Sequence, residues 1–422
     1  MKKTLIAALF LYGALHTVNA QTATYSFKPY KQMSATSVKN QQKTGTCWAF
    51  SGASFLESEV KRINGFDVDL SEMYVVRHIY RQKCENYVRR QGTAQFGEGG
   101  LAHDVMNAIR SYGIVPDAEY PGRKDAGQPF DHGRLVEDLE SLCKKKVNEG
   151  KNGTLNPDWL KEVDELLDET FGPLPTKFTV DNRQFTPMMY RDYLGIQPDQ
   201  YITVTSFTHH PFYQPFVLEI PDNFSNGMMY NVPLEDLMNC INHSLRQGYT
   251  VQWDADVSNE GFSAKNALAL VPELSWAEKS EAQRESTFKY REPQKKITQA
   301  YRQEMFDRQV TTDDHLMHIT GIETEASTTE IFYTVKNSWG EISDLKGYLR
   351  ASEPYVRLNT VSVLVHKSAL PDLVSQRLGI TEGEGIIPEP PLPKSKDKKT
   401  PGKPAKVIKQ VPIAPKAKPA TE

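Results

Sequence analysis

The sequence predicts an α+β fold in which helices come first and a β-rich part comes late in the chain. Residues 47–64 place apolar side chains at helical spacing. Residues 249–257 and 315–337 consist instead of strand-like runs. The region from about 120 to 300 mixes both kinds of element and is predicted to be a large insertion. The chain has 422 residues, 39% of them hydrophobic, which is enough to bury a large core.

The first 20 residues have the pattern of a secretory signal peptide. Two lysines precede the apolar stretch 5–15, and small residues end the segment at Ala20. We therefore expect the mature chain to begin near Gln21 and to be periplasmic or secreted. The apolar stretch is too short for a permanent membrane span. The formal net charge of -3 does not indicate binding to nucleic acid.

Three helices are predicted in the first part of the chain. The apolar face of the first, residues 47–64, consists of Ala49, Ala53, Leu56, Val60 and Ile63. Gly65 is expected to end this helix, and Ser71 is a good N-cap for the second. A glycine-rich loop at 97–100 precedes the third helix, which is expected at 101–111.

The middle of the chain alternates between helical and strand-like sequence. Helices are predicted at 133–172, 233–248 and 275–308. Short strands are predicted at 176–204, 214–220 and 249–257. We expect all of these segments to belong to one folded domain that spans residues 21–386.

A different composition begins after that domain. Residues 387–422 are rich in proline and lysine, and nine lysines face two acidic residues from position 394 onward. Such a sequence cannot bury enough apolar surface to become ordered. We therefore predict a disordered tail over 387–422.

The four cysteines are Cys47, Cys84, Cys143 and Cys240. An exported chain can form disulfides, but these spacings match no compact disulfide framework, and the last three cysteines are left open in this respect. Cys240 shares a predicted helix face with His243, and His209–His210 stand in a predicted loop. Neither group has a second Cys/His pair at a matching distance, so no metal site and no cofactor are predicted.

Cys47 stands where the first predicted helix begins. A thiol there lies near the positive end of the helix dipole and near free N–H groups, which favour the thiolate. Gly45 leaves room for a substrate backbone. Gln41 is positioned to direct its amide N–H at a developing oxyanion, together with the N–H of Cys47. For a lone cysteine, a buried thiol at a helix start is the alternative interpretation.

His315 and Asn337 bound the late pair of strands. A turn centred on Ala326 would place them opposite each other. The Asn oxygen would then accept one imidazole N–H and leave the other ring nitrogen for the thiol. His318 would point to the opposite face, with Thr334 as its cross-strand partner. We therefore interpret His318 as a structural residue.

Three stretches resemble the papain superfamily of cysteine peptidases. They are NQQKTGTCWAFS at 40–51, DDHLMHITGIE at 313–323 and VKNSWGE at 335–341. The resemblance implies a papain-like two-domain fold, with a helical left domain and a β-barrel-like right domain. The mixed segment at about 120–300 would be inserted between them.

The resemblance also implies a role for each matching residue. Cys47 would be the nucleophile, His315 the base, Asn337 its orienter and Gln41 the side chain of the oxyanion hole. Trp339 would shield the His–Asn pair from water. Contacts with the substrate are expected at Gly45, Trp48, Gly99, Gly100 and Trp339.

Within the superfamily, the chain is most similar to the bleomycin hydrolase/aminopeptidase C branch. The segments 97–116 and 230–257 resemble parts of that branch, and 268 positions separate the nucleophile from the base. The branch implies an aminopeptidase that acts on peptide substrates without a cofactor, and a homohexameric assembly. A cysteine endopeptidase is one alternative, and an inactive peptide-binding protein on the same fold is another.

Overall fold

The computed structural model describes residues 23–123 and 127–380, all of which belong to one compact unit. The predicted signal peptide (1–20) and the predicted tail (387–422) lie outside these residues. Within the described ranges, no helix is long and apolar enough to cross a membrane.

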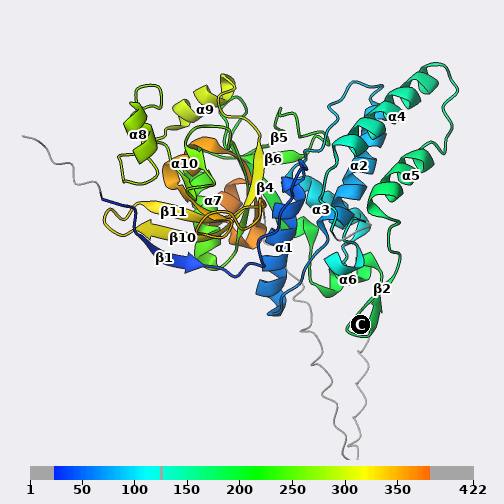
Figure 1. Cartoon of the computed structure of the whole chain (residues 1–422), viewed down its shortest axis with the longest axis horizontal. Helices are drawn as coiled ribbons and strands as arrows, with labels where there is room; N and C mark the ends of the chain where they lie inside the picture. The colour runs from blue at the N-terminus through cyan, green and yellow to red at the C-terminus, as the bar shows by residue number, and fades with distance from the viewer. Residues whose placement is uncertain (1–22, 124–126, 381–422) are drawn as a thin grey trace, which may run out of the picture. The chain divides into compact units, whose positions relative to one another are not determined.

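Five helices form the first part of the fold (Figure 1). They are α1 (Cys47–Asn64), α2 (Glu72–Arg89), α3 (Ala102–Tyr112), α4 (Gly133–Lys151) and α5 (Leu160–Phe171). Helices α2 and α3 pack on α1, and α4 and α5 pack on α2. One apolar core connects them. The three helices predicted for this part of the chain are confirmed.

The ends of α1 and α2 follow from local chemistry. Gly65 ends α1 in the left-handed region at a φ of 76°, which glycine adopts without steric cost. Ser71 precedes α2, and its hydroxyl accepts the N–H of Tyr74 at 3.0 Å. Because both signals act within one turn of the helix, the sequence alone was enough to predict these boundaries.

A mixed sheet forms the second part of the fold. Its strands are β1 (Phe27–Gln32), β4 (Tyr201–Thr205), β5 (Pro215–Val217), β6 (Met228–Asn231), β7 (Val251–Ala255), β8 (Phe262–Ser263), β9 (Leu268–Ala269), β10 (His315–Glu325), β11 (Ile331–Lys336), β12 (Tyr348–Ser352) and β13 (Thr360–His366). They are ordered β5-β6-β4-β13-β7-β10-β11-β12-β9-β8, and β1 pairs with β10. Strand β10 is therefore central, with β7 and β11 beside it.

Helix α7 (Leu234–Gln247) packs on this sheet against β1, β7, β10 and β13. Trp253 on β7 is fully buried in the apolar core between them. The predictions of a helix at 233–248 and a strand at 249–257 are confirmed. Helix α7 is thus followed directly by β7, a buried strand that pairs with β10.

The smaller elements surround these two parts. They are β2 (Phe178–Val180), β3 (Arg183–Phe185), α6 (Pro187–Tyr193), α8 (Glu281–Ser286), α9 (Gln299–Asp307), α10 (Glu353–Asn359), α11 (Asp372–Arg377) and three short 3-10 turns at Asp117–Glu119, Pro198–Gln200 and Lys367–Ala369. The prediction of strand over 176–204 is wrong at α6. Thr186 caps that helix and Pro187 occupies its first turn, a local helix start that the strand-like pattern concealed. The helical prediction for 275–308 holds only at α8 and α9.

The register of the β10–β11 hairpin also differs from the prediction. His318 pairs with Lys336 and not with Thr334. The turn is centred later than Ala326, and a bulge at Thr320 shifts the pairing within β10. The two predicted catalytic residues at the end of the hairpin are consequently not a directly opposed pair.

The two parts of the fold meet where α1 packs against β7 and β10. Gln252 on β7 donates its amide to the carbonyl of Trp48 at 3.1 Å and to the hydroxyl of Ser51 at 3.0 Å. These bonds hold the first turn of α1 against the sheet. The start of α1 is therefore fixed relative to the first residues of β10.

Candidate active site

Cys47 is the first residue of α1, and only 7% of its surface is exposed. The first N–H groups of a helix have no partner within the helix, so its own N–H is available to an acceptor. A main-chain hydrogen bond from Leu316 reaches the Cys47 thiol. Since Leu316 follows His315 directly, this contact brings the thiol to the beginning of β10.

His315 begins β10, and its ring is held from two sides. Its Nε2 lies 2.7 Å from Oδ1 of Asn337, which follows the last residue of β11. Trp339 stacks on the ring at a centroid distance of 4.6 Å and an interplanar angle of 29°. The Asn oxygen can only accept here, so His315 carries a proton on Nε2 and leaves Nδ1 unprotonated when the ring is neutral. His315 and Asn337 form this bond although they are not directly opposed in the β10–β11 ladder. Asn337 lies one residue beyond the end of β11, so its position is not set by the strand pairing.

Gln41 is fixed between the helix start and the segment after Asn337. Its Nε2 donates to the carbonyl of Thr44 at 2.7 Å, and its Oε1 accepts from the hydroxyl of Ser338 at 2.5 Å. The N–H of Gln41 also donates to the Ser338 carbonyl at 2.8 Å. The amide is thus held with one N–H still available on Nε2.

Burial controls the protonation of both central groups. It raises the pKa of the Cys47 thiol to about 12, against the hydrogen bond from Leu316. It also lowers the pKa of His315 to about 4, against the hydrogen bond to Asn337. At neutral pH the resting pair is therefore an uncharged thiol and an uncharged imidazole.

The residues predicted to contact substrate lie on both sides of Cys47. Gly45 donates its N–H to Oε2 of Glu98 at 2.6 Å, and the indole Nε1 of Trp48 donates to the Glu98 carbonyl at 3.0 Å. Trp48 is fully buried and lies against Gly100. The Trp48 side chain therefore packs against the 97–100 loop.

Gly99 has a close neighbour that sequence reasoning missed. A Cβ at this position would clash with Oδ2 of Asp222, which belongs to the connection between β5 and β6. Glu98 and Ser338, described above, were missed as well. Glu98 lies in the glycine-rich loop 97–100 and Ser338 in the stretch 335–341, so a search of these motifs could have found both. Asp222 is more than 120 positions from Gly99 and lies in no motif, so no sequence signal pointed to it.

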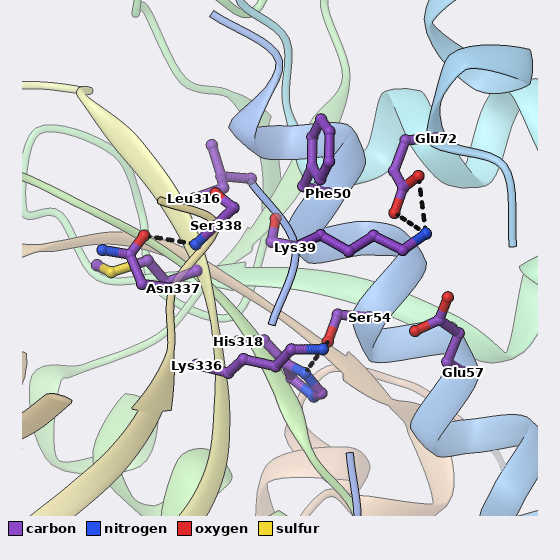
Figure 2. Close-up of a pocket in the computed structure, with 12 residues that line it drawn as sticks. Lys39, Phe50, Ser54, Glu57, Glu72, Leu316, His318, Lys336, Asn337 and Ser338 are labelled. Atoms are coloured by element: carbon purple, nitrogen blue, oxygen red, sulfur yellow. Dashed lines mark hydrogen bonds and ion pairs between the residues drawn. The ribbon is translucent and has the colours of Figure 1, made fainter. Parts of the chain in front are cut away.

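A pocket beside Asn337 is lined mainly by polar residues, which come from both parts of the fold (Figure 2). Nζ of Lys336 donates to Oγ of Ser54 at 2.8 Å, and this hydroxyl lies 2.9 Å from Nδ1 of His318. Nζ of Lys39 lies 2.8 Å from Oε1 of Glu72. The ring of His318 thus contacts α1, which agrees with the interpretation of His318 as a structural residue.

Other histidines and cysteines lie elsewhere. His243 bonds through Nδ1 to the carbonyl of Ala369 at 2.9 Å, while Cys240 is buried in the apolar core. His209 and His210 both contact Glu219, at 3.3 Å and 2.8 Å, so their side chains converge on one carboxylate.

All four cysteines of the sequence are free. The thiols of Cys84 on α2 and Cys143 on α4 are close enough for a hydrogen bond between them. Both are buried in the core of the helical part, where a thiol packs as a small apolar group.

The comparisons with known proteins agree with this architecture. A sequence model of the Peptidase C1-like family matches residues 85–384, a range that includes His315 and Asn337 and begins after Cys47. Aminopeptidase C of Listeria monocytogenes serovar 1/2a is 24% identical over 404 residues, covering 86% of this chain and 88% of that protein. Aminopeptidase C of Lactococcus lactis subsp. cremoris is 25% identical over 369 residues, covering 79% and 81%. The crystal structure of PepW from Lactobacillus rhamnosis HN001 matches with a TM-score of 0.66 and 19% identity, covering 83% and 84%.

Proposed function

Because this chain belongs to the Peptidase C1-like family and is a cysteine-type peptidase of the papain-like superfamily, we propose that it is an exported aminopeptidase whose nucleophile is Cys47. One observation carries the assignment of the site. His315 is bonded to Asn337 at 2.7 Å beneath Trp339, and the residue after His315 contacts the Cys47 thiol. A base bonded to its orienter, with the proposed nucleophile beside the next residue, supports acyl transfer at this site.

The first half of the reaction forms a thioester. The Cys47 thiol transfers its proton to Nδ1 of His315 as sulfur attacks the carbonyl carbon of the substrate. The carbonyl oxygen becomes an oxyanion, which the N–H of Cys47 and Nε2 of Gln41 stabilise. His315 then protonates the leaving amine, the C–N bond breaks, and the acyl group stays on sulfur.

The second half releases the product. A water molecule gives its proton to His315 and attacks the thioester carbonyl. The same two donors bind the second oxyanion, and the C–S bond breaks with return of the proton to Cys47. Oδ1 of Asn337 accepts the hydrogen bond from Nε2–H of His315 throughout, so the ring keeps its orientation when it becomes charged.

The uncharged resting pair has a consequence for the mechanism. Burial disfavours a lone thiolate and a lone imidazolium alike. The proton is therefore expected to move when substrate occupies the cleft, since the two charges then form next to each other and offset one another.

The aminopeptidase assignment is supported by the relatives named aminopeptidase C, and export by the pattern of residues 1–20. To test both, the full chain is expressed in a host with a secretory pathway, and the recovered protein is analysed by intact mass and by hydrolysis of fluorogenic peptides. We expect a chain that begins at Gln21 and cleaves peptides with free N-termini. The same peptides with acetylated N-termini should resist cleavage.

Cys47→Ala is the control for this experiment. Loss of all cleavage in this variant supports the assignment of the nucleophile, and residual cleavage at the wild-type rate contradicts it. Cleavage of the acetylated peptides would make the protein an endopeptidase. A chain recovered with its first 20 residues intact would contradict export.

A further inference from the structure

Three carboxylates from distant parts of the chain surround one side of Cys47. Asp254 is on β7 and pairs in register with Leu316, whose main chain contacts the thiol. Asp313 stands two residues before the base, and its carboxyl group lies beside that of Asp254. Asp222 comes from the connection between β5 and β6, and its main chain bonds to the Asp313 carboxylate. The mechanism described above uses none of them.

Asp222 occupies the space beside Gly99. A Cβ on Gly99 would clash with both carboxylate oxygens, so the carboxylate lies directly against this glycine. Nζ of Lys83 donates to the Gly97 carbonyl at 2.8 Å and to that of Gly99, which holds the 97–100 loop in place. The space in which a side chain at position 99 would stand is therefore occupied by the carboxylate of Asp222.

The cluster contains buried acceptors that lack a donor. Asp254 is 1% exposed, and its Oδ1 has no hydrogen-bond donor among the described residues, while its Oδ2 accepts from Ser362 at 3.2 Å. Oδ2 of Asp313 is likewise buried without a donor in the described part of the chain. A buried acceptor without a donor is costly, so a proton or a cationic donor is expected there.

No cation is among the main electrostatic influences on the pKa values of Asp254 and Asp313. The charges that act on Asp254 and Asp313 are those of other carboxylates, Asp222 among them. Lys83 is close to Asp222, but its bonds go to the loop carbonyls. A primary ammonium group offers three donors and one positive charge, which matches this combination of acceptors and charge.

We propose that Asp222, Asp254 and Asp313 form the subsite for the α-ammonium group of the first residue of the substrate. This inference rests on the proposed function, because it assumes that Cys47 attacks the carbonyl of that same residue. Asp222 excludes a preceding residue by occupying the space beside Gly99. An acetylated peptide is rejected twice, since it lacks the charge and carries extra atoms toward Asp222.

The subsite also connects binding to reactivity. Beyond burial, Asp254, Asp313 and Asp222 in their ionised forms each raise the pKa of the Cys47 thiol. An ammonium group among them offsets this charge and makes the thiolate easier to form. A free N-terminus therefore activates the nucleophile that cleaves it, whereas a blocked peptide leaves the thiol protonated.

The test is Asp222→Asn in the full chain, with Asp199→Asn as the matched control. Asp199 is an exposed carboxylate that pairs with Arg110 on α3. Hydrolysis of one fluorogenic peptide with a free and with an acetylated N-terminus is measured for wild type and both variants. We expect kcat/KM for the free peptide to fall at least tenfold in Asp222→Asn, mainly through KM. The preference for the free over the acetylated peptide should fall by a similar factor, and the control should match wild type.

A second readout separates a binding role from a structural one. Without substrate, alkylation of Cys47 by iodoacetamide should be faster in Asp222→Asn than in wild type, because a charge that opposes the thiolate is gone. A role in holding the loop would leave this rate unchanged or lower it. An unchanged preference for the free peptide in Asp222→Asn would overturn the proposal.

Binding in the absence of catalysis distinguishes this inference from the proposed function. Calorimetry with Cys47→Ala measures the affinity for a dipeptide amide and for its acetylated form. We expect the free amine to bind at least tenfold more tightly, and Asp313→Asn in the same background to remove the difference. Equal affinities would overturn the subsite even if Cys47 is confirmed as the nucleophile. If Asp222→Asn does not fold, this experiment decides the question.

Discussion

At the scale of single residues, the site depends on side chains whose orientation is fixed by more than one bond. Gln41 is bonded to Thr44 on one side and to Ser338 on the other. His315 is held by Asn337 and by Trp339. Preorganised donors of this kind stabilise a transition state without having to reorient during the reaction.

Gln41→Ala removes a proposed oxyanion donor. We expect kcat to fall about 10²- to 10³-fold, as is usual when one such donor is lost. Because Cys47 and His315 are untouched, the rate of alkylation of Cys47 should remain that of wild type. A loss of activity accompanied by an equal loss of alkylation would show that Gln41 acts through the thiol instead.

Asn337→Ala tests the orientation of the base. The ring of His315 would lose the acceptor at Nε2 that selects its tautomer, so kcat should fall while KM changes little. Asn337→Gln keeps an amide but extends it by one methylene, and we expect it to recover at most part of the activity. Wild-type kcat in Asn337→Ala would contradict the assigned role.

At the scale of elements, polar side chains that line the pocket beside Asn337 connect α1 to β10 and β11 (Figure 2). The Ser54 hydroxyl on α1 lies between Nζ of Lys336 and Nδ1 of His318. Burial lowers the pKa of Lys336 to about 8, which shows that the ammonium is poorly solvated there. The hydroxyl is therefore important for the contact between the two parts of the fold.

Ser54→Ala would leave both neighbours without this partner. A buried polar group that loses its hydrogen bond costs about 1 to 3 kcal/mol, so the free energy of unfolding should fall by that amount in urea titration. Ser111→Ala, at an exposed position in α3, is the control and should change it by less than about 0.5 kcal/mol. Equal effects of the two substitutions would show that the contact contributes nothing.

At the scale of the whole molecule, burial of neutral histidines makes stability depend on pH. The pKa of His78 is lowered to about 3, and those of His132 and His366 to about 4, in each case chiefly by burial. The unfolded chain binds protons at these groups below about pH 6.5. Their contribution to stability is therefore fully present above that pH and is lost as the pH falls toward 4.

His78→Phe tests this dependence at one position. The His78 ring stacks on Tyr112 at a centroid distance of 3.9 Å, and phenylalanine keeps a flat ring there. Between pH 7 and pH 5, wild type should lose about 2 kcal/mol more stability than the variant, as measured by urea unfolding at both pH values. Tyr112→Phe alters the same stack without removing the histidine and should keep the acid sensitivity of wild type. Equal losses in wild type and His78→Phe would contradict the prediction.

Several features of the fold were predictable because they depend on neighbours along the chain. The span of α1 follows from its apolar spacing and from Gly65, and the N-cap of α2 from Ser71. The strands β10 and β11 were recognisable from their apolar runs. In the site, the residues around Cys47, His315 and Asn337 were found because their motifs are contiguous.

Other features were decided only by tertiary structure. The register of the β10–β11 hairpin depends on a bulge and a turn whose geometry the amino-acid pattern does not specify. The meeting of Asp222 with Gly99 depends on the path of a long insertion. The protonation states of Cys47 and His315 depend on desolvation by residues from both parts of the fold.

By itself, the sequence determined which residues are the candidates for the chemistry of this peptidase, because helix starts, strand runs and contiguous motifs are local properties. The tertiary structure decided which side chains stand beside these candidates, such as Asp222 against Gly99, and how burial shifts their pKa values. Both depend on long-range packing and on burial, and neither leaves a pattern between neighbouring residues.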